Sequence, residues 1–156
     1  MVRVGLIADT HDLLRDEAVA FLSGSDHIIH AGDIMKEQIL QPLADLAPVT
    51  VVRGNNDRSA WGQSLPETAF ITLEQVGIYV IHDLKDLAVD PVELGARVVI
   101  SGHSHTPLIT ERGGVLYVNP GSAGRRRFKL PISVAELSIA GREVSARIVE
   151  LAIPPR

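Results

Sequence analysis

Polar side chains that can bind a metal ion follow five short apolar runs of this sequence. Each cluster stands just past the carboxyl end of a run rich in β-branched residues. The candidates are two aspartates, one asparagine and four histidines: Asp9, His11, Asp33, Asn55, His82, His103 and His105. Carboxylate and amide oxygens mixed with imidazole nitrogens suit a divalent metal ion. Because the chain has no cysteine, any metal must be held by nitrogen and oxygen ligands.

Two of these clusters have the spacing of a ligand pair. A single residue separates Asp9 from His11, and a single residue separates His103 from His105. Residues two apart in an extended chain face the same way, so both members of each pair are expected to reach one site. Glycine immediately precedes three of the candidates, at Gly32, Gly54 and Gly102. A tight turn at such a glycine lets the backbone approach an ion.

Each cluster taken alone has a structural explanation. A lone Gly-Asp or Gly-Asn-Asn-Asp is most often a turn, because asparagine and glycine tolerate left-handed conformations. A lone histidine is often a satisfied core residue or a surface residue. Here all five clusters occur once, in order, each at an expected strand end, and they use four of the six histidines. This completeness favours one shared site over unrelated turns.

The elements that must position the clusters alternate between strand and helix in the first half of the chain. Apolar runs predict strands over 2–8, 27–30 and 49–52, and helical spacing predicts helices over 14–22 and 36–46. In α/β folds the ends of parallel strands converge on one rim, and ligands bind there. The five clusters are therefore expected to meet.

The second half is richer in hairpins. Strands are expected over 69–73 and 78–81 around a turn at 75–77, followed by a helical turn over 90–94 and a strand over 97–100. Two further hairpins, 109–110 with 115–118 and 132–139 with 143–151, surround Gly113-Gly114 and Gly141. This order predicts a mixed sheet covered by helices, with two sheets face to face. Residues 154–156 are expected to fray.

Length and composition limit the class of protein. A chain of 156 residues with 46% hydrophobic residues suits one domain spanning 1–156. A net charge of -4 argues against strong nucleic-acid binding, which is driven by phosphate neutralisation. No apolar run has the length of a membrane span or a signal-peptide core, so we expect a soluble, cytoplasmic protein without membrane contact.

The ordered set D-x-H, G-D, G-N-x-D, H and G-H-S-H resembles the calcineurin-like metallophosphoesterase superfamily, and within it the small prokaryotic single-domain phosphodiesterases. The resemblance runs from Val4 to about Leu137 and includes Asn119-Pro120-Gly121-Ser122. It implies a four-layer α-β-β-α sandwich of two mixed sheets, with a dinuclear metal site at the strand ends.

The resemblance also implies a role for each candidate ligand. One metal would take Asp9, His11 and His105. The second would take Asn55, His82 and His103, and Asp33 would bridge the two. A hydroxide bridging two ions about 3.5–4 Å apart would attack phosphorus in line with the leaving group. The expected activity is therefore phosphodiester hydrolysis with two divalent ions. Mn²⁺ is the first choice, and Fe, Zn, Ni and Co are the alternatives.

The sequence leaves several details of the site undecided. Many superfamily members have a leaving-group histidine where this chain has Asn56, and an asparagine amide cannot act as a general acid. Substrates with good leaving groups are therefore expected. Asp83 stands where the family commonly has glycine, beside the second metal. Arg125-Arg126-Arg127 is either a phosphate contact or a solvated basic turn, with the turn somewhat favoured. His30 is either a hydrogen-bond partner of the ligands or a buried structural histidine.

Two other functions are also compatible with these motifs. The same fold occurs in a retromer subunit that has lost part of its metal shell and serves as a scaffold. The seven ligand candidates kept here favour the enzyme over such an interaction module. A phosphomonoesterase or a nuclease is the rival among enzymes. The expected partner is a small phosphoester substrate. Relatives are often dimers or tetramers, and an exposed edge strand in the second half would allow a homo-oligomer.

Overall fold

The computed structural model of the protein describes residues 1–127 and 129–153. The strands are β1 (Val2–Ile7), β2 (His27–His30), β3 (Val49–Val51), β4 (Thr68–Leu73), β5 (Val76–Ile81), β6 (Val98–Ile100), β7 (Leu108–Arg112), β8 (Val115–Asn119), β9 (Ser133–Ala140) and β10 (Glu143–Glu150). The helices are α1 (Asp16–Leu22), α2 (Leu40–Ala44), α3 (Ala60–Gln63) and α4 (Pro91–Leu94), with 3₁₀ turns η1 (Glu37–Ile39) and η2 (Leu84–Asp86). The fraying expected at 154–156 lies outside the described residues.

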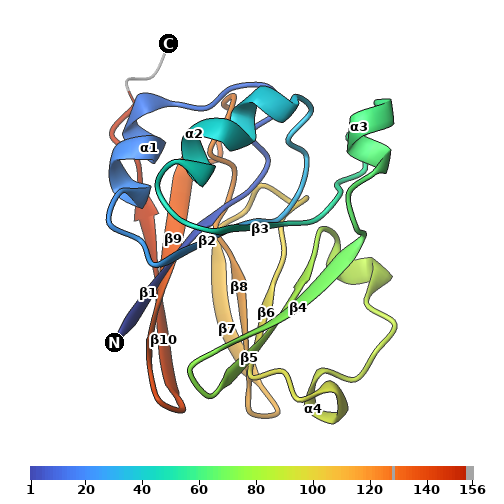
Figure 1. The fold of residues 1–156 in the computed structure, drawn as a ribbon, viewed down its shortest axis with the longest axis vertical. Coiled ribbons are helices and arrows are strands. Elements are labelled where there is room, and N and C mark those ends of the chain that lie inside the picture. Colours follow the sequence, from blue (N-terminus) through green and yellow to red (C-terminus); the bar gives the residue numbers. More distant parts are fainter. Residues whose placement is uncertain (128, 154–156) are drawn as a thin grey trace.

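The strands form two five-stranded mixed sheets (Figure 1). The first sheet has the order β10-β9-β1-β2-β3, and the second has the order β4-β5-β6-β8-β7. In the first sheet β1, β2 and β3 run parallel, while β9 and β10 form an antiparallel hairpin beside β1. In the second sheet β5, β6 and β8 run parallel, with antiparallel strands at both edges. The expected α/β class with two mixed sheets is confirmed.

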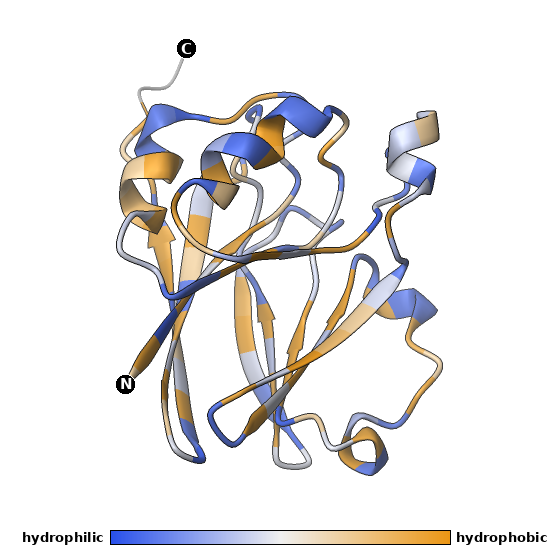
Figure 2. Cartoon of the chain, viewed as in Figure 1, coloured by the Kyte–Doolittle hydropathy of each residue, from blue (hydrophilic) through white to orange (hydrophobic). Residues whose placement is uncertain are grey.

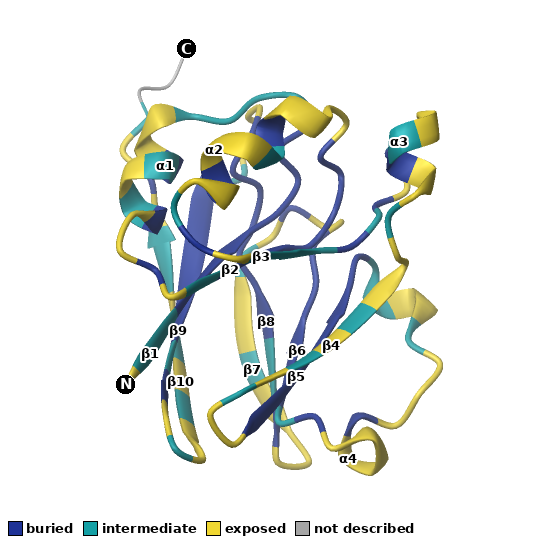
Figure 3. Ribbon diagram, in the orientation of Figure 1, coloured by how far each residue is buried: buried dark blue, intermediate teal, exposed yellow. Residues whose placement is uncertain are grey.

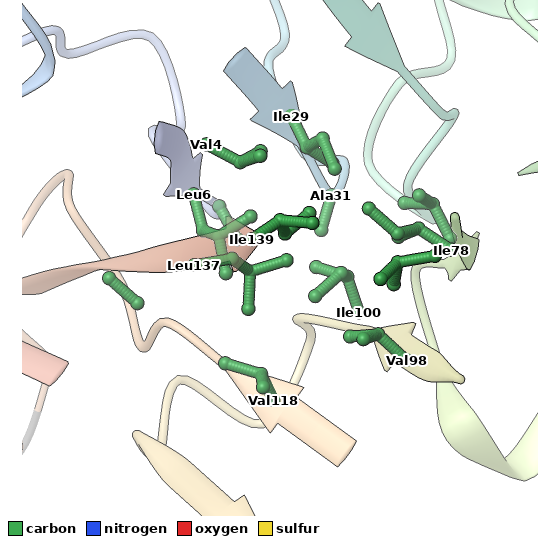
Figure 4. Packing of buried hydrophobic residues seen from close by; sticks show 14 of the residues in the cluster. Val4, Leu6, Ile29, Ala31, Ile78, Val98, Ile100, Val118, Leu137 and Ile139 are labelled. Carbon is green, nitrogen blue, oxygen red and sulfur yellow. The ribbon is translucent and has the colours of Figure 1, made fainter. Parts of the chain in front are cut away.

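The main core lies between the two sheets. Val4, Leu6 and Ile29 of the first sheet point toward Ile78 and Ile100 of the second (Figure 4). All of these side chains are fully buried. The alternation of strand side chains sends Ile7 to the opposite face, where it packs beneath the helices. β1 is covered on both faces from Val4 to Ile7, and this part of the strand carries no charged residue; Arg3, before it, is only partly buried. Figure 2 shows β1 as mostly hydrophobic with a hydrophilic band near the N-terminus.

The outer layers of the sandwich are unequal. The first sheet is covered by α1, through Ala18 and Leu22, and by α2, through Leu43. On the second sheet, within the described residues, the outer cover is smaller: Leu84 of η2, with Leu87 and Ala96 from the chain that follows, packs in one cluster with Tyr79 and Val99. Figure 3 shows buried central strands and exposed outer surfaces on these helices. The fourth layer is therefore much thinner than the implied α-β-β-α sandwich.

The helices differ from the sequence predictions in two places. The helix expected over 36–46 begins as the 3₁₀ turn η1 and becomes α-helical only at Leu40. Pro42 explains this start, because proline has no N–H and is tolerated only in the first turn of a helix. The short helix α3 was not expected at all. Its N-cap Ser59 accepts a hydrogen bond from the Gly62 N–H at 3.0 Å.

The turn between β4 and β5 is also placed differently. It consists of Glu74 and Gln75 alone, with Glu74 at φ 53°, so Val76 and Gly77 belong to β5. Gly77 is needed for close approach rather than for turning, because a Cβ there would lie 2.3 Å from the Gly95 carbonyl oxygen. The turns at Gly113-Gly114 and at Gly141 are as expected. Among the described residues, no helix is long and apolar enough to cross a membrane.

Candidate metal centre

All seven candidate ligands lie in the loops that follow strands of the two sheets. The loops after β1, β2 and β3 carry Asp9, His11, Asp33 and Asn55, and the loops after β5 and β6 carry His82, His103 and His105. The first four candidates therefore come from one sheet and the last three from the other. The candidates meet where the two sheets face each other, as the convergence of strand ends predicts.

The side chains form two adjacent sets. The first ligand group is Asp9, His11 and His105, all buried, with Asp9 Oδ1 3.7 Å from His11 Nε2 and 3.6 Å from His105 Nε2. The second ligand group contains Asp33, His82 and His103 together with Asn55. The members of each pair predicted from spacing do reach the site, but His103 and His105 join different groups.

Asn55 closes the second ligand group. Its amide oxygen Oδ1 lies 3.0 Å from His82 Nε2 and 3.0 Å from His103 Nδ1. His82 is fixed from behind, because its Nδ1 donates to the Ala31 carbonyl at 2.7 Å. This hydrogen bond aims Nε2 at the site. One oxygen and two nitrogens thus converge on a single point.

Asp33 lies between the two groups. Its Oδ2 is 3.4 Å from His11 Nε2, a member of the first ligand group, and 3.4 Å from His82 Nε2, a member of the second. The Asp33 carboxylate is 2% exposed and lies nearer to both histidines than Asp9 Oδ1 does, which is 3.7 Å from His11 Nε2 and 3.9 Å from His82 Nε2. Its position is that of a carboxylate shared between two ligand sets.

The ligand loops are not extended, which corrects the reasoning from spacing. Five candidates adopt left-handed backbone conformations: Asp9 (φ 53°), His11 (φ 45°), Asp33 (φ 60°), His103 (φ 71°) and His105 (φ 62°). Such φ values are uncommon for residues with a Cβ and persist only when the surroundings enforce them. Here backbone hydrogen bonds do so: Asp9 N–H donates to the Gly32 carbonyl and His11 N–H to the Asp33 carbonyl, each at 3.0 Å.

The glycines before the ligands make room for other ligands rather than for an ion. A Cβ at Gly54 would lie 2.1 Å from Asp33 Oδ1, and a Cβ at Gly32 would lie 2.6 Å from His82 Nδ1. Gly32 also has φ 105°, a conformation that side chains rarely adopt. The expected close approach therefore exists, but it is between backbone and side chain.

Asp57 is a residue of the site that sequence reasoning passed over as part of a turn. Its carboxylate is 2% exposed and accepts four backbone hydrogen bonds. The donors are the N–H groups of Asp33, Ile34, Met35 and Gly54. Asp57 thereby joins the loop that carries Asp33 to the loop that carries Asn55. The last position of the G-N-x-D motif was the available signal.

His30 is a buried structural histidine that joins two ligand loops. Its Nδ1 accepts a hydrogen bond from the Gly32 N–H at 3.1 Å, so in the neutral ring Nε2 carries the proton and donates to Thr10 Oγ1 at 3.1 Å. Complete burial and the neighbouring His82 lower the pKa of His30 to about 3. His30 is therefore uncharged near neutral pH.

The electrostatics of the site centre on Asp33 and His82. Burial disfavours the charged form of both side chains, yet their mutual interaction outweighs burial. It lowers the pKa of Asp33 well below its usual range and raises the pKa of His82 to about 9. Burial lowers the pKa of His105, and the charge of Arg127 contributes in the same direction. Without a bound cation, His82 supplies the positive charge that Asp33 requires.

Two atoms of the first ligand group indicate what the site is built to hold. Within the part of the chain that the structure describes, Asp9 Oδ1 and His11 Nε2 are buried and have no hydrogen-bond partner. A buried carboxylate oxygen without a partner is costly unless a cation meets it. The oxygen and nitrogen donors, without sulfur, suit a divalent ion. The residues present therefore fit a metal.

The positions that departed from the expected pattern lie around this centre. Asn56 donates from its backbone N–H to Asp33 Oδ1 at 2.8 Å and from its side-chain amide to Asp33 Oδ2 at 3.1 Å. Asp83 Oδ2 lies 3.5 Å from His103 Nε2. Among the three arginines, which are all exposed, Arg126 donates to the Ile153 carbonyl at 3.1 Å.

Two hollows open beside the second ligand group. The polar hollow, about 270 Å³, is lined by Arg53, Asn55, Glu67, His82, Asp83 and Asp86. The apolar hollow, about 410 Å³, is lined by Leu84, His103, Thr106, Leu108 and Tyr117 among others. Asp83 borders both. Together they give a bound molecule room in two adjoining places beside the second ligand group.

Comparison with known proteins defines the class. The model of the calcineurin-like phosphoesterase superfamily domain matches residues 2–142, and the chain belongs to this superfamily. The chain is also 38% identical, over 97% of its length and 94% of the relative's, to a probable metallophosphoesterase of Methanothermobacter thermautotrophicus. The resemblance read from the motifs is therefore confirmed, and the family is one of metal-binding hydrolases.

Solved structures share the fold at lower identity. Vacuolar Protein Sorting 29 from Cryptosporidium parvum has a TM-score of 0.82 at 19% identity, covering 96% of this chain and 91% of that one. A structure described as a novel archaeal phosphodiesterase has a TM-score of 0.73 at 20% identity, covering 95% of this chain and 100% of that one. At these identities the likeness establishes the fold alone.

Proposed function

We propose that this chain is a phosphodiesterase that uses two divalent metal ions, with residues 1–156 acting as one catalytic domain. The observation that carries the proposal is the pair of adjacent ligand groups with Asp33 between them. Asp9, His11 and His105 would hold one ion, and Asn55, His82 and His103 would hold the other. When bound, the ions would supply positive charge for the phosphate oxygens and a water of lowered pKa. Mn²⁺ is the first candidate.

The residues of the chain prepare the site for these ions. The lowered pKa of Asp33 keeps its carboxylate ionised throughout the working range of pH. The Ala31 carbonyl and the Asp57 carboxylate hold His82 and the Asp33 loop in place, so little rearrangement is needed on binding. His82, whose pKa is about 9, must lose its proton as the second ion binds. Metal affinity should accordingly rise with pH.

Asn56 supports diesters with good leaving groups as substrates. Its amide donates to Asp33, and an amide cannot give a proton to a departing alkoxide near neutral pH. An aryl oxide leaves without such help. Asn56 is then a residue that orients the shared carboxylate rather than a general acid.

A scaffold is the second candidate function. The observation in its favour is the likeness of the fold to Vacuolar Protein Sorting 29. The unpartnered, buried Asp9 Oδ1 argues only against a scaffold that holds no cation, because a buried carboxylate oxygen without a partner is costly. A scaffold that binds metal without catalysis is therefore the form of this rival that the experiment must test. A phosphomonoesterase remains the rival within the superfamily. We place the protein in the cytoplasm, as a dimer or tetramer, on the expectations from sequence.

The deciding experiment is hydrolysis of bis(4-nitrophenyl) phosphate by chelator-stripped protein, with and without Mn²⁺. Turnover restored by Mn²⁺ in the wild type and absent from Asp33→Asn would support the dinuclear phosphodiesterase. 4-Nitrophenyl phosphate, measured beside it, separates a diesterase from a monoesterase. A folded protein that binds two ions yet cleaves neither ester would favour the scaffold.

A further inference from the structure

The apolar hollow lies directly against the second ligand group. His103 is both a member of that group and part of the lining of the hollow. The remaining lining comes from η2, through Leu84 and Lys85, and from the outer face of the second sheet, through Leu108 and Tyr117. A molecule held at the second ligand group therefore has an apolar surface within reach beside His103.

The thin fourth layer of the sandwich explains why this surface is open. The outer face of the second sheet is covered by η2 and α4 near β5 and β6, while Leu108 on the edge strand β7 remains 50% exposed. Tyr117 is partly exposed, and the Arg112 guanidinium lies 4.5 Å from the centre of its ring. This contact helps to hold the ring in place. The hollow thus offers an aliphatic and an aromatic side chain to a ligand.

The polar hollow, which also borders the second ligand group, has a different character. Its lining includes Arg53, Glu67 and Asp86, which favour hydrated or hydrogen-bonding groups. A phosphodiester carries two organic substituents on one phosphorus atom. Two unlike hollows beside one phosphate position therefore suit a diester whose substituents are themselves unlike.

We propose that the apolar hollow binds one substituent of the phosphodiester substrate, and that this substituent is a flat, largely apolar group of about the size of an aromatic ring. A volume of about 410 Å³ is ample for such a group and falls within the range of small-molecule sites. Leu108 and Tyr117 supply the apolar contact. This inference rests on the proposed phosphodiesterase function and extends it from a reaction to a class of substrate.

The test compares two stable diesters, diphenyl phosphate and dimethyl phosphate, as ligands of the Mn²⁺-loaded protein by calorimetry. Diphenyl phosphate is expected to bind about tenfold more tightly or better, because only its ring can fill the hollow. Leu108→Ser should remove most of that preference. Ile109→Ser is the matched control, because Ile109 is 37% exposed on the same strand and faces the other side of the sheet. Tyr117→Ala provides a second variant within the hollow.

The outcomes separate the two proposals. Equal affinity for both diesters, or a preference unchanged in both Leu108→Ser and Tyr117→Ala, would overturn the assignment of the hollow. Hydrolysis of bis(4-nitrophenyl) phosphate would then still support the phosphodiesterase. Conversely, a preference for diphenyl phosphate that is lost in Leu108→Ser supports binding of the substituent in the apolar hollow. If no diester is hydrolysed in that case, the proposed phosphodiesterase reaction is contradicted while the assignment of the hollow stands.

Discussion

The two ligand groups differ in how deeply their side chains are buried and in whether their polar atoms already have partners. In the first, Asp9, His11 and His105 are at most 7% exposed, and a buried oxygen waits without a hydrogen-bond partner. In the second, Asn55 is exposed and the His103 side chain is 41% exposed, while Asn55 Oδ1 already contacts both histidines. In the proposed enzyme, this difference would make the first group a closed site that retains its ion, and the second an open site where the ion exchanges more easily and meets the substrate.

The largest effect is expected from the residue that belongs to both groups. Asp33→Asn removes the negative charge that faces His11 and His82, so neither group keeps its full ligand set. We expect turnover to fall roughly 10³-fold or more, since several kcal/mol of charge stabilisation depend on the ions. Metal content and turnover of the same preparation measure this. Full activity with two ions bound would remove Asp33 from its bridging role.

A large loss of stability is expected on replacing Asp57, which is not one of the seven candidate ligands. Asp57→Ala leaves four backbone N–H groups without their acceptor, and we expect the free energy of unfolding to fall by about 3–5 kcal/mol. Glu111→Ala, which breaks only the exposed pair with Arg97, is the control and should cost about 1 kcal/mol or less. Denaturant unfolding of the metal-free proteins gives both values. Equal losses would show that the two loops do not depend on Asp57.

Acid should lower the free energy of unfolding through protonation of His30, which connects the loop of the first ligand group to the loop of Asp33. The folded protein keeps His30 neutral with a pKa of about 3, whereas the unfolded chain protonates it near the model value of 6.5. Its contribution to stability is complete above pH 6.5 and is lost as the pH falls toward about 3. At pH 5 the expected loss is about 2 kcal/mol.

The measurement is unfolding of metal-free wild type and His30→Gln at pH 7 and pH 5. The variant should lose about 2 kcal/mol less than the wild type between these values. Comparing the two proteins cancels the titration of the other histidines, including His82, whose raised pKa acts in the opposite direction. Parallel pH dependence in both proteins would contradict the prediction.

The smallest effect is expected from replacing Asp83, and it should distinguish the two ligand groups by their affinity for metal. Asp83 Oδ2 lies 3.5 Å from His103 Nε2, whereas Asn55 Oδ1 lies 3.0 Å from Nδ1 of the same ring, so Asp83 contacts the ring through the nitrogen that does not face Asn55. Asp83→Gly should weaken binding of the second ion about tenfold and leave the first unchanged. A stepwise Mn²⁺ titration distinguishes the two ions. Weakening of both ions alike would mean that the groups do not act separately.

The sequence predicted the parts of the molecule that depend on local patterns. Apolar runs located the strands, and the polar clusters at their ends identified all seven side chains that the fold brings together. Those positions are readable because strand burial follows a simple alternation and because convergent strand ends follow from parallel pairing. The roles of the seven as metal ligands remain proposals.

What the sequence could not predict depends on contacts between distant segments. The left-handed conformations of Asp9 and His103 are imposed by hydrogen bonds from other loops, so a rule for extended chain failed there. The importance of Asp57 lies in donors more than twenty residues away. The apolar hollow exists because one outer layer is thin, which no local pattern records.

The candidate ligands come from both sheets, and this determines when the site can form during synthesis of the chain. Every candidate ligand precedes β9, yet β9 pairs with β1 and places Leu137 and Ile139 in the core between the sheets. A growing chain on the ribosome therefore carries the complete set of ligands before it can hold them in place. In the proposed enzyme, capture of the ions would then be a late event of synthesis, and a chain cut short before β9 would contain every candidate ligand without the strand that pairs with β1.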